Sequence, residues 1–78
     1  MLLDELRARF EQAGHRVSPR DDVDAAAVSW FLEHSVGTLR NWRSQGKGPP
    51  YITLGCGVRY PLTGLVQWLA QQVRNLAA

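Results

Sequence analysis

A group of hydrogen-bonding side chains lies within residues 37–47, which read Gly-Thr-Leu-Arg-Asn-Trp-Arg-Ser-Gln-Gly-Lys. Arginine and asparagine carry planar groups that can form two parallel hydrogen bonds with a planar partner, and arginine and lysine also neutralise anions. Arg40 and Asn41 are adjacent, and Arg43 and Lys47 follow closely. These residue types at this spacing predict recognition of an anionic, polar partner through hydrogen bonds and charge.

Residues suited to catalysis are sparse. His15 and His34 have no second ligand at metal-binding spacing, and the chain has no glycine-rich phosphate loop, paired catalytic carboxylates or Ser/His/Asp arrangement. The single cysteine, Cys56, excludes both a disulfide within the chain and a zinc site made of several thiolates. We therefore expect no enzymatic activity, no metal and no other cofactor.

The charge of the chain is divided between its two parts. Residues 35–78 contain five basic residues and no acid, whereas residues 1–34 contain four arginines and all seven acids. The two parts therefore carry formal charges of +5 and −3, although the whole chain carries only +2. A basic half without acids is suited to a polyanion such as a nucleic acid.

Apolar periodicity predicts two helices in the first part of the chain. The first covers residues 2–13 and ends at Gly14, and a surface connection follows over residues 15–22. The second covers about residues 23–32. Trp30 points away from the buried side of this second helix, and we expect it to pack against the first helix, with a partner or dimer surface as the alternative.

A third helix is predicted over about residues 36–44. Ser35 is its expected N-cap, because a serine hydroxyl can accept a hydrogen bond from a free amide of the first turn. Leu39 and Trp42 are expected to face inward. The opposite face then consists of Gly37, Arg40, Asn41 and Ser44. An outward Arg-Asn pair on a short, anchored helix is typical of elements that read base edges.

The segment after this helix predicts a β-hairpin and a closing helix. Pro49 and Pro50 lack amide donors and so exclude a helix or a central strand. Residues 51–54 and 58–60 are predicted strands, and residues 62–76 form an amphipathic helix with a broad apolar stripe. The turn of the hairpin consists of Gly55, Cys56 and Gly57. A cationic helix, a hairpin and a further helix in this order are typical of a winged helix.

The chain resembles the excisionase-like and MerR-like winged helix-turn-helix DNA-binding domains over about residues 23–70. The residues that carry the resemblance are Ser35, Thr38, Leu39, Trp42, Gly46, Gly48-Pro49-Pro50-Tyr51, Leu54-Gly55, Val58-Arg59-Tyr60, Leu65 and Trp68-Leu69. It implies a mainly α fold with a small two-stranded β-hairpin. We expect this winged helix-turn-helix domain over residues 21–78, preceded by an N-terminal amphipathic helix and connection over residues 1–20.

The resemblance also implies a role for each residue type. The helix over residues 36–44 would enter the major groove of DNA, where Arg40 and Asn41 reach base edges and Gly37 and Ser44 share their face. The residues expected at phosphates are Thr38, Arg43, Lys47 and Arg59. The turn of Gly55, Cys56 and Gly57 would form the tip of the wing.

Three places depart from the family pattern. Glu33 and His34 replace the glycine and the small apolar residue usual in the turn between the two helices. Cys56 and Gly57 stand where the wing often carries basic residues, which predicts a weaker contact of the wing with phosphate. Gly64 replaces a common acid early in the last helix, at a cost of up to ~1 kcal/mol in helix propensity.

The resemblance and the charge together predict a small sequence-specific DNA-binding protein, of the excisionase-like kind that binds and bends DNA during recombination. Its expected partners are double-stranded DNA, an integrase or recombinase, and further copies in a cooperative array. The alternatives are a compact dimeric transcriptional regulator of a phage or mobile element and, less favoured, a protein-interaction adaptor. An acidic start and the lack of a long apolar run predict a cytoplasmic, nucleoid-associated protein without a membrane partner.

Overall fold

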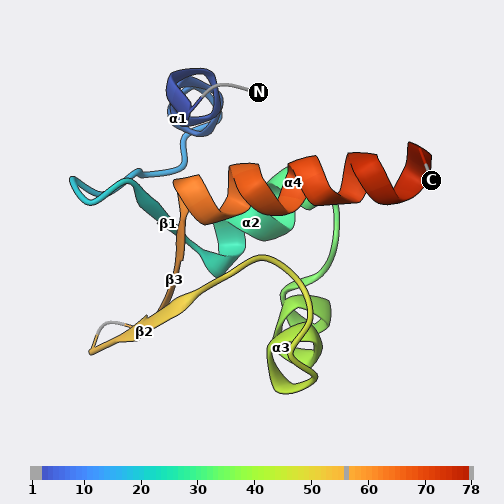
Figure 1. The fold of residues 1–78 in the computed structure, drawn as a ribbon. Helices are drawn as coiled ribbons and strands as arrows, with labels where there is room; N and C mark the ends of the chain where they lie inside the picture. The colour runs from blue at the N-terminus through green and yellow to red at the C-terminus, as the bar shows by residue number, and fades with distance from the viewer. Residues whose placement is uncertain (1–2, 56, 78) are drawn as a thin grey trace.

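The computed structural model describes residues 3–55 and 57–77. The elements follow in the order α1 (Leu3–Gln12), β1 (Asp22–Asp24), α2 (Ala25–Leu32), α3 (Val36–Ser44), β2 (Ile52–Leu54), β3 (Gly57–Pro61) and α4 (Leu62–Ala77) (Figure 1). In Figure 1, α2 and α4 lie between α1 on one side and α3 on the other. The predicted combination of helices with a small β-hairpin is confirmed.

The sheet has three strands, so it contains one strand more than the predicted two-stranded hairpin. β1 pairs with β3, which also pairs with β2, and both pairings are antiparallel. The residues of β1 were expected in the surface connection and at the start of the second helix. Only Val23 in β1 is apolar, so the strand has no periodic signal. It forms because β3 offers a free edge for hydrogen bonding and because Val23, opposite Tyr60, becomes fully buried.

A single hydrophobic core joins α1 to the rest of the fold. Leu6 and Phe10 of α1 are fully buried in the same cluster as side chains from every other helix and from β1 and β3. Trp42 and Trp68 are half-buried against this cluster, with their ring centroids 6.0 Å apart. The buried members are Leu6, Phe10, Val23, Ala27, Val28, Leu39, Tyr60, Leu62 and Leu65.

Local capping interactions set the bounds of the helices. Gly14, with φ of +87°, follows the end of α1 as predicted. Asp24 caps α2, because its carboxylate accepts a hydrogen bond of 2.9 Å from the amide of Ala27. Ser35 caps α3 by accepting a hydrogen bond of 3.0 Å from the amide of Thr38, which confirms the predicted cap.

The start of α4 packs closely on the proline segment that precedes β2. A Cβ atom at Gly64 would lie 3.1 Å from Cγ of Pro50, so the absence of a side chain at Gly64 permits this contact. Glycine at this position therefore has a packing reason. Further along α4, Val73 is 66% exposed, although it is an apolar residue of the predicted amphipathic helix over residues 62–76. The apolar stripe of α4 therefore extends beyond the part of the fold that could cover it.

Candidate nucleic-acid interface

The outward face of α3 presents four of the predicted site residues together. Gly37, Arg40, Asn41 and Ser44 are all exposed, whereas Leu39 on the inward face is 1% exposed. α3 also stands at one side of the molecule, with no other helix beyond it in Figure 1. The helix therefore offers a guanidinium and a carboxamide side by side to an external partner.

Hydroxyl groups at both ends of α3 take part in hydrogen bonds within the helix. The Thr38 hydroxyl lies 2.9 Å from the Ser35 hydroxyl, where either group can donate. The Ser44 hydroxyl donates to the carbonyl of Asn41 at 2.8 Å. A hydroxyl has one proton to donate, so Ser44 can offer only acceptor lone pairs to a partner. Of the two hydroxyl protons of Ser35 and Thr38, one is used in the hydrogen bond between them, and the other remains available to a partner.

Arg43 links the C-terminal part of α3 to the sheet. Its Nη1 donates a hydrogen bond of 2.7 Å to the hydroxyl of Tyr60, which is 1% exposed on β3. Its guanidinium also lies 5.8 Å from the ring centroid of Tyr51, which is 41% exposed. A guanidinium has five N–H donors, so Arg43 keeps donors for an external anion while its position is held by the two tyrosines.

Lys47 is exposed in a segment that folds back on the end of α3. Its backbone amide donates a hydrogen bond of 2.7 Å to the carbonyl of Trp42. The next residue, Gly48, has φ of +84°, and a Cβ atom there would lie 2.8 Å from Cε3 of Trp42. Close packing of Gly48 on Trp42 therefore holds the backbone of Lys47 beside α3.

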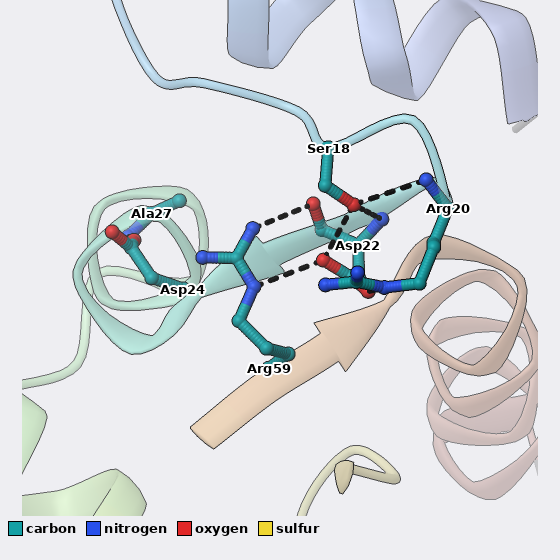
Figure 2. A network of polar contacts seen from close by, with 6 residues as sticks. All are labelled: Ser18, Arg20, Asp22, Asp24, Ala27 and Arg59. Atoms are coloured by element: carbon teal, nitrogen blue, oxygen red, sulfur yellow. Dashed lines mark hydrogen bonds and ion pairs between the residues drawn. The ribbon is translucent and has the colours of Figure 1, made fainter. Parts of the chain in front are cut away.

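Arg59, which was predicted to contact phosphate, forms hydrogen bonds within the fold. Its Nε donates to Oδ1 of Asp22 at 2.9 Å, and its Nη2 donates to the Asp22 carbonyl at 3.2 Å (Figure 2). The Arg59 side chain is only 19% exposed. The structure gives Arg59 a partner that the sequence did not indicate, because its guanidinium is directed at a buried carboxylate 37 residues away.

Asp22 is the centre of this polar network. It is 1% exposed, and its carboxylate also accepts hydrogen bonds from the Ser18 hydroxyl at 2.7 Å and from Nε of Arg20 at 3.1 Å (Figure 2). Burial acts to raise the pKa of Asp22 and is the largest single influence. The hydrogen bonds from Ser18, Arg59 and Arg20 together outweigh it, so the pKa lies below the usual value of an aspartate.

The lowered pKa of Asp22 predicts a dependence of stability on pH. A carboxylate with a lowered pKa in the folded state stabilises the fold above its unfolded-state pKa of about 3.9, and this contribution is lost as the pH falls through the folded value. The unmodified protein should therefore have a higher free energy of unfolding than the Asp22→Asn variant. This difference should be largest near neutral pH and should narrow below about pH 4. Urea unfolding of both proteins from about pH 7 to about pH 2 measures it. A difference that stays constant over this range contradicts the prediction.

The turn of the hairpin is described in part. Gly55 and Gly57 are exposed, and Gly57 has φ of +118°, a conformation that favours glycine. Cys56, the third residue of the predicted wing tip, lies outside the described residues.

Two further exposed side chains, Val36 and Tyr51, lie near the predicted site and are not among the predicted site residues. Val36 is 43% exposed at the start of α3, and its position four residues before Arg40 could have placed it on the same face. Tyr51 is exposed beside Arg43, which no local pattern indicates because the two residues belong to different elements. Both are candidates for contact with a bound partner.

Comparison of the chain with models of protein families, with curated proteins and with solved structures finds no match in any of the three. Among the described residues, no helix combines the length and the apolar character required to cross a membrane. No three His, Cys, Asp or Glu residues in that same part of the chain are grouped so that they could hold a metal ion.

Proposed function

We propose that the protein binds double-stranded DNA through a winged helix-turn-helix formed by α2, α3 and the hairpin of β2 and β3. The observation that carries this proposal is the exposed face of α3, where Arg40 and Asn41 lie side by side. This face belongs to residues 35–78, which contain five basic residues and no acid. An α-helix fits the major groove, and arginine and asparagine are suited to the edges of guanine and adenine.

The absence of a side chain at Gly37 supports the proposal that a partner approaches the start of α3 closely. A Cβ atom there would meet only Oγ of Ser35, at 3.8 Å, so packing within the chain does not require glycine. Glycine in a helix costs up to about 1 kcal/mol relative to alanine, and Gly37 lies in the first turn of α3. A binding partner that approaches the helix backbone closely accounts for that cost. In this arrangement Arg40 and Asn41 contact base edges, and Arg43 and Lys47 contact phosphates on either side.

Substitution of Arg40 and of Lys47 should have different effects on DNA binding. Loss of a bidentate base contact in Arg40→Ala should weaken binding to a duplex selected from a randomised library by ~1–3 kcal/mol and relax its sequence preference. Loss of a phosphate contact in Lys47→Ala should weaken binding to all duplexes alike and reduce the slope of log K against log salt by about 1. Fluorescence anisotropy with labelled duplexes measures both effects.

The control for these variants is Arg16→Ala, because Arg16 is an exposed arginine in the acidic part of the chain. It should leave both affinity and salt dependence unchanged. If the affinity of the unmodified protein for random duplex barely changes between low and high salt, phosphate binding is excluded, and a protein-interaction adaptor becomes the better description.

We further propose that the DNA-binding role is that of an excisionase-like factor which bends DNA during recombination. The resemblance of residues 23–70 to that family supports this role, and bending would be compensated by the additional contacts that a bent duplex allows. A dimeric regulator is the second candidate, and the exposure of 43% at Trp30 favours it. Electrophoresis of complexes on circularly permuted DNA separates the two, because straight DNA in the complex supports the regulator.

A further inference from the structure

A pocket with an aromatic wall lies between α1 and the end of α2, outside the proposed DNA-binding face. It has a volume of about 310 Å³ and is lined by Arg9, Trp30, Phe31 and Glu33. We call it the Trp30 pocket. Trp30 is 43% exposed, slightly more than Tyr51 at 41%. Part of its large ring surface is therefore accessible to another molecule.

Trp30 is exposed but firmly supported from below. Its ring centroid lies 5.8 Å from that of Phe10, which is fully buried, and 5.1 Å from that of His15. Phe31 lies 6.2 Å away on the same wall. An aromatic side chain fixed in this way loses little conformational freedom on association, and tryptophans in such positions are typical anchors of protein interfaces.

The pocket carries one positive and one negative side chain. The guanidinium of Arg9 lies 5.4 Å from the ring centroid of Phe31, and Glu33 also lines the pocket. Within the described residues, Arg7 forms an ion pair with Asp21, and Arg20 and Arg59 form ion pairs with Asp22. None of these ion pairs joins Arg9 to Glu33. The two opposite charges in the pocket therefore do not neutralise each other by direct contact.

The backbone of Glu33 gives a separate reason to consider this residue. Glu33 is the C-cap of α2 and has φ of +59° and ψ of +38°, in the left-handed region. Glycine is favoured in this conformation, and a side chain there is disfavoured. The chain nevertheless places a carboxylate at this position, on the edge of the Trp30 pocket. A side chain retained at an unfavourable backbone position supports a role in contact with a partner.

We propose that the Trp30 pocket is the contact between two copies of this chain related by a twofold axis. In such a contact the same surface meets itself, so it must be self-complementary. The Trp30 pocket meets this condition, because Arg9 of each copy can face Glu33 of the other while the two Trp30 rings pack together. The proposal does not depend on DNA binding, since the residues assigned to DNA lie on α3 and beyond it in the chain.

The dimer can be measured on the full chain without DNA. An interface centred on one pocket is small and therefore reversible, so we expect monomer and dimer to exchange over about 10 µM to about 1 mM in sedimentation velocity. Arg9→Glu places two acids opposite each other, and Glu33→Arg places two bases opposite each other. Each variant alone should weaken self-association more than about tenfold through like-charge repulsion.

Mixing the two variants is the decisive measurement. When a chain with Arg9→Glu meets a chain with Glu33→Arg, both contacts across the twofold axis become attractive again. An equimolar mixture should therefore form dimers at concentrations where each variant alone is monomeric. A merely structural effect of either substitution could not be reversed in this way, because each chain in the mixture keeps its own substitution.

The matched control uses two exposed charges outside the pocket. Arg16→Glu and Glu11→Arg make the same charge changes, and both variants should associate like the unmodified protein. Thermal unfolding of each variant verifies that it is folded. The proposal is overturned if the unmodified protein is monomeric at about 1 mM, which would assign the pocket to a partner of another kind. It is equally overturned if the mixture of Arg9→Glu with Glu33→Arg remains monomeric.

Discussion

Replacement of Asp22 by asparagine is expected to lower the free energy of unfolding by about 3 kcal/mol. The two side chains have nearly the same size, so the change removes charge without opening a cavity. Asp22 is 1% exposed and neutralises Arg59, whose side chain is 19% exposed and cannot turn freely to water. Arg20 contributes less to this loss, because its side chain is 58% exposed and can be solvated.

Chemical unfolding of Asp22→Asn tests this expectation. In a domain of this size, a loss of about 3 kcal/mol also lowers Tm by roughly 12–24 °C in thermal unfolding. Asp4→Asn is the control, because it makes the same chemical change at an exposed position and should alter stability by no more than about 0.5 kcal/mol. Equal stabilities of the two variants would contradict the role of Asp22 in holding β1 to β3.

Replacement of Gly48 by alanine is expected to lower the free energy of unfolding by about 2–4 kcal/mol. Two costs combine at this residue. Its φ of +84° disfavours any side chain, and the added Cβ would lie 2.8 Å from Cε3 and 3.2 Å from Cβ of Trp42. The Cβ of Trp42 is fixed to the α3 backbone, so turning the Trp42 side chain could relieve the contact with Cε3 but not the contact with Cβ. Trp42 or the segment that carries Lys47 must move instead.

Gly46→Ala separates these two costs. Gly46 has φ of +70°, but a Cβ atom there would meet nothing within 4 Å. Its replacement should cost only about 1 kcal/mol, from the backbone conformation alone. The difference between the two variants in denaturant unfolding therefore measures the close packing of Gly48 on Trp42. Equal losses of stability in Gly46→Ala and Gly48→Ala would show that this contact is not important.

Local interactions made much of the second part of the chain predictable. The bounds of α3, its cap at Ser35 and the outward face with Arg40 and Asn41 depend on residues within one or two helical turns of each other. The hairpin of β2 and β3 similarly follows from strand-forming residues on both sides of a glycine-containing turn. Patterns of this kind can be read from the order of residues because the interacting groups are close in the chain.

Long-range contacts decided the remaining features. Arg59, a predicted phosphate ligand, pairs with Asp22, and nothing near Arg59 in the chain indicates that partner. The strand β1 depends on the free edge of β3 in the same way. Trp30 was expected to pack against the first helix, and its contact with Phe10 agrees, but its exposure depends on how far α1 extends over α2.

The amino-acid order alone thus determined the positions of α1, α3 and α4, the cap of α3 and the separation of basic from acidic residues. The tertiary structure alone decided which cations remain available to a partner, how many strands the sheet has and where the Trp30 pocket lies. The physical reason is that capping, helix periodicity and turn conformation are interactions between near neighbours. Burial of a charge, pairing at a strand edge and exposure of an aromatic ring are settled only when distant segments pack together.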